Sequence, residues 1–192
     1  MTKKQRVVLL QADVYSADWE VAKAASNRLF TFGGRFNKTG RRRNRRFLVA
    51  VLDQNEPQAR RAVALTFRKQ RYQLALPALL RAIKNPANLH QRSTMAYALE
   101  NLNCSQRLAE LFTILFGAIK NPLLQSSILN VLEEQIFEFS RTDLFTIEAQ
   151  WNTIKSDWNR LNEINSVSPT EYTYDQAVIQ NFVDGYMAYL ED

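Results

Sequence analysis

The side chains that most often catalyse reactions are few and scattered in this sequence of 192 residues. The single cysteine, Cys104 in LNCSQR, is interpreted as an inert thiol at a helix end, because a catalytic thiolate needs a basic partner. The single histidine, His90, is interpreted as a surface or capping residue. Glu133 and Glu134 are adjacent, so a helix would point them apart rather than let them share a proton. We therefore expect no catalytic centre and no enzymatic activity.

The motifs that hold metals and cofactors are also missing from the sequence. One cysteine can form neither an intrachain disulfide nor a cysteine-based zinc site. The chain has no glycine-rich phosphate loop, nucleophile elbow or HExxH motif, so no cofactor and no small-molecule substrate is expected. The apolar run Val7 to Leu10 is shorter than the roughly 7–15 residues of a signal peptide. With no run near about 18 apolar residues, the prediction is a soluble cytoplasmic protein that does not bind membranes.

One stretch, RLFTFGGRFNKTGRRRNRRFLVA, is strongly basic and contains no acidic residue. Phenylalanines are interleaved with its cations, and Gly33, Gly34 and Gly40 predict a flexible loop that leads into a helix. Arginine outnumbers lysine here, and its planar group suits bidentate contact with carboxylates or phosphates. The predicted partner-binding residues, which continue into the next helical segment, are Arg35, Lys38, Arg41, Arg42, Arg43, Arg45, Arg46, Arg60, Arg61 and Arg68.

Charge is distributed unevenly along the chain. Residues 1–72 hold 17 Lys or Arg and 5 Asp or Glu, whereas residues 73–192 hold 8 basic and 14 acidic residues. The basic stretch has three interpretations: a solvated surface, a contact for an acidic protein partner, or a nucleic-acid interface. Self-repulsion among unpaired cations disfavours the first, and repulsion of a long duplex by the acidic half disfavours the third. An acidic protein partner is therefore the leading prediction, with nucleic acid as the alternative.

The pentapeptide AIKNP occurs twice, ending at Pro86 and at Pro122. In each copy an apolar helical pattern runs into Lys-Asn-Pro and a second helical pattern follows. The residue before proline is disfavoured in a helix, while proline suits the first turn of a new one. AIKNP therefore predicts the turn of a helical hairpin, and a weaker copy surrounds Pro57. The aligned hairpins recur after 32 or 33 residues, a period typical of α-solenoids.

Between about residues 40 and 140 the chain resembles the HEAT-type or armadillo-like repeat family, through this period and its three turn prolines. The resemblance implies a short right-handed solenoid of helical hairpins whose second helices line a concave groove. In this chain that groove would present Arg60, Arg61 and Arg68 first, then His90, Gln91 and Arg92, and finally Ser126, Asn130 and Glu134. A few HEAT-like proteins are DNA glycosylases that use Asp and Trp residues; WNTIKSDW supplies Trp151, Asp157 and Trp158, but both tryptophans fall on an apolar stripe typical of a core.

The flanking segments predict further helices. The first begins with Ser16 as its N-cap and stops at Gly33 and Gly34. Another starts near Thr142 with apolar residues spaced three and four apart, which suits packing on the last hairpin better than a coiled-coil dimer. These residues are Leu144, Ile147, Trp151, Ile154, Trp158 and Leu161. A final helix has an apolar side formed by Val178, Ile179, Phe182, Val183, Tyr186, Met187 and Leu190.

Together these patterns predict an all-α protein with one helical repeat domain over residues 1–192. Residues 1–39 would form N-terminal helices and a basic loop, residues 40–140 HEAT-like hairpins, and residues 141–192 a C-terminal pair of capping helices. The predicted function is non-enzymatic protein binding, as an adaptor, an assembly factor or an inhibitor such as a toxin-neutralising protein.

Overall fold

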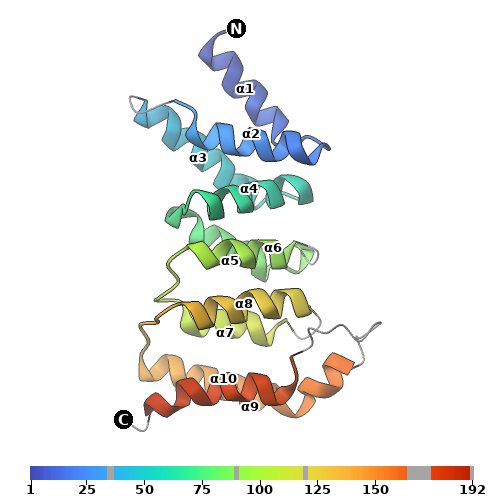
Figure 1. Cartoon of the computed structure of the whole chain (residues 1–192), viewed down its shortest axis with the longest axis vertical. Helices are drawn as coiled ribbons and strands as arrows, with labels where there is room; N and C mark the ends of the chain where they lie inside the picture. The colour runs from blue at the N-terminus through green and yellow to red at the C-terminus, as the bar shows by residue number, and fades with distance from the viewer. Residues whose placement is uncertain (34–36, 89–90, 119–120, 164–173, 191–192) are drawn as a thin grey trace. The chain divides into compact units, whose positions relative to one another are not determined.

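A computed structural model describes residues 1–33, 37–88, 91–118, 121–163 and 174–190 (Figure 1). Every regular element in these ranges is a helix, which confirms the predicted all-α class. The chain divides into two compact units, residues 1–102 and 103–192, which are described separately. The single repeat domain and its solenoid arrangement remain predictions. Of the predicted residues, Gly34, Arg35 and His90 lie outside the described ranges, as does the side chain of Leu161.

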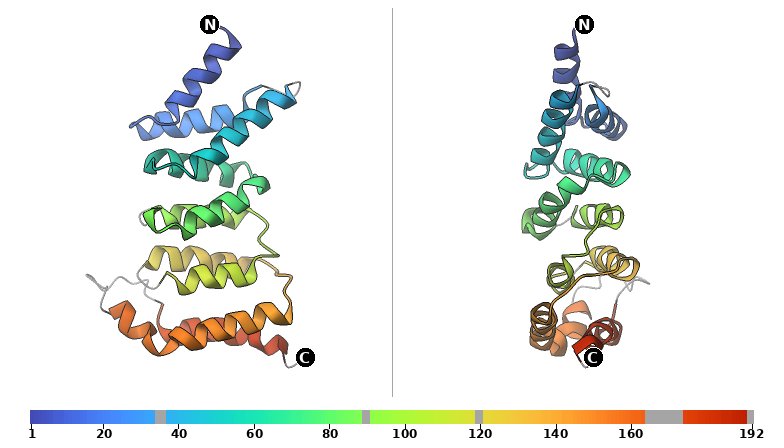
Figure 2. Two further views of the ribbon diagram at one scale, coloured as in Figure 1. Left: turned by 180° about the vertical axis from the view of Figure 1, so that it is seen from behind. Right: turned by 90° about the vertical axis from the view of Figure 1, so that its left-hand side faces the viewer.

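The first unit begins with four α-helices joined by short connections. These are α1 (Lys3–Asp13), α2 (Trp19–Thr31), α3 (Lys38–Val51) and α4 (Pro57–Lys69). The central pair is α2 and α4, and α3 starts beside the end of α2 and runs obliquely towards α4 (Figure 2). Small residues such as Ala22, Ala25, Ala59 and Ala62 are buried along the central pair and let the two helices pack closely.

The rest of the first unit consists of shorter helices. It contains η1 (Gln73–Ala75), α5 (Leu76–Lys84), η2 (Pro86–Asn88), α6 (Arg92–Tyr97) and η3 (Ala98–Asn101). The predicted hairpin turn is confirmed here, because α5 ends at Lys84 and Pro86 opens η2 before α6 begins. The buried amide of Asn88 donates from Nδ2 to the carbonyl of Ala82 at 2.7 Å, which ties this turn to the preceding helix.

The described residues of the second unit form four α-helices. These are α7 (Leu108–Phe116), α8 (Pro122–Glu134), α9 (Arg141–Glu163) and α10 (Gln176–Met187), with η4 (Ala188–Leu190) after them. Pro122 is the first residue of α8 and Asn121 is its N-cap, accepting from the amide of Leu124 at 3.0 Å, so a new helix begins at the second AIKNP proline, as predicted; Ile119 and Lys120 of this motif lie outside the described residues. Within this unit α7 packs against α8 and α9, and α9 packs against α10.

Aromatic side chains form the core of the second unit. Trp151 and Trp158 on α9 are almost fully buried, and their ring centroids lie 5.5 Å apart. The Trp151 ring also stacks on Phe116 of α7 at 5.5 Å. Each indole N–H has an acceptor, Gln180 for Trp151 and the carbonyl of Tyr174 for Trp158. This confirms the interpretation of the α9 stripe as core and explains how two large amphipathic rings are buried without losing hydrogen bonds.

Two predicted helix starts differ from the structure. The N-cap of α2 is Asp18 rather than Ser16: its carboxylate accepts from the amides of Glu20 at 2.8 Å and Val21 at 3.2 Å. Ser16 instead accepts from the amide of Asp18, so it supports the turn that precedes the helix. A carboxylate also stabilises the positive N-terminal end of a helix, which a hydroxyl does less well. The second predicted helix start that differs is that of α3, in the basic stretch.

Candidate functional site

The basic stretch forms a helix from Lys38 onward, two residues before the predicted boundary between the basic loop and the hairpins at residue 40. Asn37 is the N-cap of α3 and accepts from the amide of Gly40 at 2.9 Å. Farther along, Asn44, Leu48 and Val51 are buried at a spacing that places them on one face. Packing of this face fixes the segment as a helix despite the glycine and the repelling cations.

The start of α3 violates the usual electrostatics of helices. The N-terminal end of a helix carries a partial positive charge and favours acidic residues. The first turn of α3 has no acidic residue, and the first six residues of the helix, KTGRRR, include Lys38 and three arginines. Gly40 adds a helix-propensity cost of about 1 kcal/mol relative to Ala. A helix start with several unfavourable features is typical of a site retained for function.

Four of the predicted contact residues on α3 are exposed to solvent: Lys38, Arg42, Arg43 and Arg46. Across the described part of the chain, no carboxylate forms an ion pair with any of these four. Arg61 on α4 is exposed as well, and its guanidinium lies 4.8 Å from the centre of the Trp19 ring. We call these five exposed side chains together the arginine face; four lie on α3, which begins beside the end of α2, and Arg61 lies by Trp19 at the start of α2. They retain unneutralised positive charge for an external anionic group.

Arg45 has a structural role instead. Its guanidinium lies 4.1 Å from the centre of the Phe30 ring and 5.3 Å from that of Tyr72, and the two rings are themselves 5.1 Å apart. The side chain is half-buried. Cation–π contacts of this kind hold α3 against the end of α2 and the segment after α4. Arg41 is also half-buried, so neither residue belongs to the freely accessible part of the predicted site.

Arg60 and Arg68 also interact mainly within the first unit. Arg60 is 2% exposed and donates to Oδ1 of Asn55 at 3.2 Å. Burial lowers the pKa of its guanidinium, while the neighbouring Glu56 acts in the opposite direction. Arg68 donates to Oε2 of Glu100 at 2.8 Å and to the carbonyl of Tyr97 at 3.2 Å, and lies 3.8 Å from the centre of the Tyr97 ring. It thereby links α4 to α6 and η3.

Arg92, predicted to line the middle of a groove, is half-buried and donates from Nε to the carbonyl of Ile83. Burial lowers the pKa of this guanidinium too. Gln91 is half-buried beside it. In the second unit Ser126 is half-buried, whereas Asn130 and Glu134 are exposed. Of the charges predicted to grade along a groove, those of Arg60, Arg68 and Arg92 are therefore largely engaged within the first unit.

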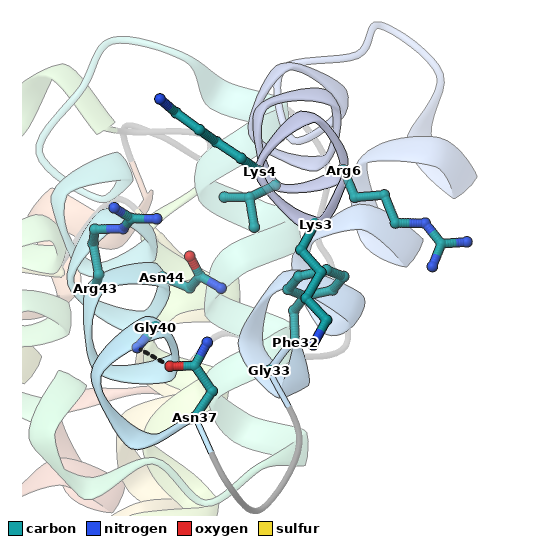
Figure 3. Close-up of a pocket in the computed structure, with 10 residues that line it drawn as sticks. Lys3, Lys4, Arg6, Phe32, Gly33, Asn37, Gly40, Arg43 and Asn44 are labelled. Atoms are coloured by element: carbon teal, nitrogen blue, oxygen red, sulfur yellow. Dashed lines mark hydrogen bonds between the residues drawn. The ribbon is translucent and has the colours of Figure 1, made fainter. Parts of the chain in front are cut away.

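A pocket of about 610 Å³ lies beside the start of α3 and was not predicted (Figure 3). One wall comes from α1, with Lys3, Lys4 and Val7. The end of α2 supplies Phe32 and Gly33, and the opposite wall comes from the start of α3. The residues from this last wall are Asn37, Gly40, Arg43 and Asn44. Three consecutive helices thus build one basic pocket.

The sequence signals for this pocket were weak and separate. The basic start MTKKQR is common near N-termini, and Asn44 is hidden in an arginine-rich run. Gly33 has a φ of 117°, a conformation that glycine adopts with little strain, so it directs the chain away from α2 at the pocket. Only the spacing of Asn44 with Leu48 and Val51 marks Asn44 as a core position.

The structure also places Cys104, Glu133 and Glu134, three other described residues that were considered for chemistry from the sequence. Cys104 is fully buried, and burial raises the pKa of its thiol to about 11, with a smaller lowering effect from the Gln135 hydrogen bond. This supports its interpretation as inert. Glu133 and Glu134 are both exposed. The described residues contain no group of acidic, His and Cys side chains that could hold a metal ion, and none of their helices is long and apolar enough to span a bilayer.

Comparison of the chain with protein-family models, curated proteins and solved structures found no match. The functional assignment therefore depends on the geometry of the first unit.

Proposed function

We propose that this chain is a non-enzymatic binding protein that holds an acidic protein partner on its arginine face. The observation that supports this proposal best is the set of exposed, unneutralised cations on α3 and α4. The side chains are Lys38, Arg42, Arg43, Arg46 and Arg61. Guanidinium groups bind carboxylates in bidentate geometry and lose less on desolvation than ammonium groups, so they suit a protein interface.

The helical hairpins supply the scaffold in this proposal. Short hairpins with proline turns are compatible with a HEAT-like repeat, in which adjacent units bury one another's apolar faces. A short solenoid of this kind presents side chains from successive helices on one surface. An adaptor, an assembly factor and an inhibitor that neutralises a toxin all use such a surface, and cytoplasmic location is part of the same proposal.

Nucleic acid remains the second candidate, because the same unneutralised charges would also bind phosphates. One observation disfavours it. Two aromatic rings of this unit are engaged internally: Phe30 contacts Phe67 and Tyr72, and Trp19 is covered by Arg61, whereas Phe32 lines the pocket beside Arg43. Single-stranded nucleic acid is usually held by free aromatic rings on which bases stack.

The test compares three full-length proteins in a pull-down from the native lysate, with and without nuclease. The test variant carries Lys38→Gln, Arg42→Gln, Arg46→Gln and Arg61→Gln. The control carries Lys69→Gln, Lys84→Gln, Arg141→Gln and Lys155→Gln, which removes the same charge elsewhere. We expect one protein band that survives nuclease, persists in the control and is lost in the test variant. The purified partner should then bind with an affinity that falls as salt increases.

Two outcomes would overturn the proposal. Retention of the band by the test variant would show that the arginine face is not the contact. Loss of all bands after nuclease, with recovery of nucleic acid from untreated samples, would assign the face to phosphate binding. Circular dichroism of both variants checks that folding is unchanged.

A further inference from the structure

We propose that the pocket between α1, α2 and α3 binds a small hydroxylated phosphate monoester, of about the size of a sugar phosphate or a nucleoside monophosphate. This inference does not depend on the proposed protein partner. It concerns a neighbouring site in the same unit that shares Arg43 with the arginine face, and it would overturn the expectation that the chain binds no small molecule.

The charge around the pocket favours an anion. Lys3, Lys4 and Arg43 line it, and none of them is paired with a carboxylate of the described chain. Figure 3 shows Lys4 on the α1 wall and Arg43 and Asn44 on the α3 wall, while Arg6 points away from the other lining residues. The N-terminal end of α3, with its partial positive charge, closes one side at Asn37 and Gly40. Cations on two walls and the positive end of a helix on the third side favour an anion such as phosphate.

Asn44 provides the independent indication of a ligand. Its side chain is 1% exposed and lines the pocket, and its Oδ1 atom has no hydrogen-bond partner. A buried acceptor without a donor is unfavourable, and most such atoms in folded proteins are paired. Asn44 also occupies a core position of α3 that an apolar residue would fill at lower cost. Oδ1 has almost no solvent-accessible surface in this structure, so a ligand hydroxyl donates to it once the carboxamide turns over and exchanges its oxygen and nitrogen positions.

The need for both an anion and a donor defines the ligand class. Inorganic phosphate satisfies the cations and keeps a P–O–H donor near neutral pH, but it is much smaller than the pocket, whereas a phosphate ester of a sugar offers an anion and hydroxyl donors that lie far enough apart to occupy it. The volume of about 610 Å³ lies within the range of small-molecule pockets and exceeds what one phosphate needs. Phe32 and Val7 supply apolar surface for the rest of the ligand.

Isothermal titration of the full chain tests the proposal with four probes. The probes are ribose 5-phosphate, adenosine 5′-monophosphate, inorganic phosphate and adenosine. We expect at least one of the two esters to bind about tenfold or more tightly than inorganic phosphate, and adenosine to show no binding. Equal binding of the esters and inorganic phosphate, or no binding of any ester at millimolar concentration, would overturn the proposal. A single-stranded oligonucleotide that binds when both monomeric esters fail would overturn it in favour of nucleic acid.

Two sets of variants locate the binding. Lys3→Gln, Lys4→Gln and Arg43→Gln together should weaken ester binding about tenfold or more. The matched triple Lys23→Gln, Lys69→Gln and Lys84→Gln, with equal loss of charge in the same unit, should change it less than about threefold. Equal weakening by both triples would show attraction by net charge only. Neither triple alters the four residues tested for the protein partner, so failure of one proposal does not imply failure of the other.

Asn44→Leu separates a binding role from a structural one. Leucine has a similar size and removes the unpaired buried oxygen, so the free variant should melt at a higher temperature than the original protein. Its ester binding should nevertheless weaken about tenfold or more. A variant that melts higher and binds equally well would overturn the role assigned to Asn44. If leucine lowers the melting temperature, Asn44→Ser tests the same loss of binding with a smaller polar side chain, and unchanged binding there would also overturn it.

Discussion

Individual side chains in this protein separate into those that support the fold and those left free to bind. Arg45, Arg60 and Arg68 share the charge of the arginine face but are covered by aromatic rings, buried, or paired with Glu100. A sequence shows the guanidinium groups without showing which of them already have partners. The ten predicted contact residues therefore include a smaller accessible set, and Arg35 lies outside the described residues.

Cys104 provides the prediction at the residue scale. Its thiol is buried and its pKa is raised from 9.0 to about 11, chiefly by desolvation. We expect no reaction with a disulfide reagent in the native protein at pH 7–8 within an hour, and one equivalent after denaturation. Rapid stoichiometric labelling of the native protein would contradict this burial.

The raised pKa of the Cys104 thiol also affects the stability of the fold at high pH. The folded pKa exceeds the unfolded value, so the contribution of Cys104 to stability is complete below about pH 9 and is lost as the pH rises towards 11. Cys104→Ala should remove this part of the pH dependence. Urea unfolding of both proteins at pH 7, 9 and 10.5 measures it.

At the scale of elements, α3 is the helix whose sequence and packing conflict most. The cations at its start repel one another, and this part of the helix also contains Gly40. Its later turns bury Leu48 and Val51 completely. Local sequence rules placed the helix start near residue 40, because Gly33, Gly34 and Gly40 suggested a flexible segment before it. The tertiary contacts that overrule them come from α2 and α4, which no local window contains.

Asn37→Asp tests this conflict directly. A carboxylate at the N-cap keeps the bond to the Gly40 amide and adds negative charge at the positive end of α3, which should stabilise the protein by about 0.5–1 kcal/mol. The melting temperature should rise by about 1–4 °C, measured by circular dichroism. Asn37→Ala, which removes the cap, should lower it. A lower melting temperature for the Asp variant would contradict the electrostatic interpretation of this helix start.

The turns were predictable, and the pocket was not. Proline restricts the backbone conformation of its own position and of the residue before it. Pro57, Pro86 and Pro122 therefore mark helix boundaries to within a few residues. The buried stripe of α9 that contains Trp151 and Trp158 was predictable for the same reason, because its spacing of three and four residues can be read within one short segment. The pocket instead needs Lys4 of α1 to lie beside Asn44 of α3, and this proximity depends on how helices pack.

For the whole molecule, the two units carry opposite charge. Residues 1–102 contain 20 basic and 6 acidic residues, whereas residues 103–192 contain 5 basic and 13 acidic residues. Two copies should therefore attract each other, first unit to second unit, when little salt is present. Such a head-to-tail contact does not close into a symmetric dimer.

Sedimentation velocity tests this attraction. At 20 mM NaCl we expect the weight-average sedimentation coefficient to increase with protein concentration, and at 300 mM NaCl we expect no such increase, because salt screens exposed charges. The Lys38, Arg42, Arg46 and Arg61 variant should associate less at low salt. Association that is unaffected by salt would contradict an electrostatic origin.

The placement of the three tryptophans has a spectroscopic consequence. Trp151 and Trp158 are buried in the second unit, while Trp19, the only tryptophan of the first unit, is half-buried beneath Arg61. Emission from Trp19 should therefore lie at longer wavelength than emission from the two buried indoles. A partner that engages Arg61 would change the red edge of the spectrum and leave the blue edge constant. The protein thus contains its own fluorescent reporter for occupancy of the arginine face.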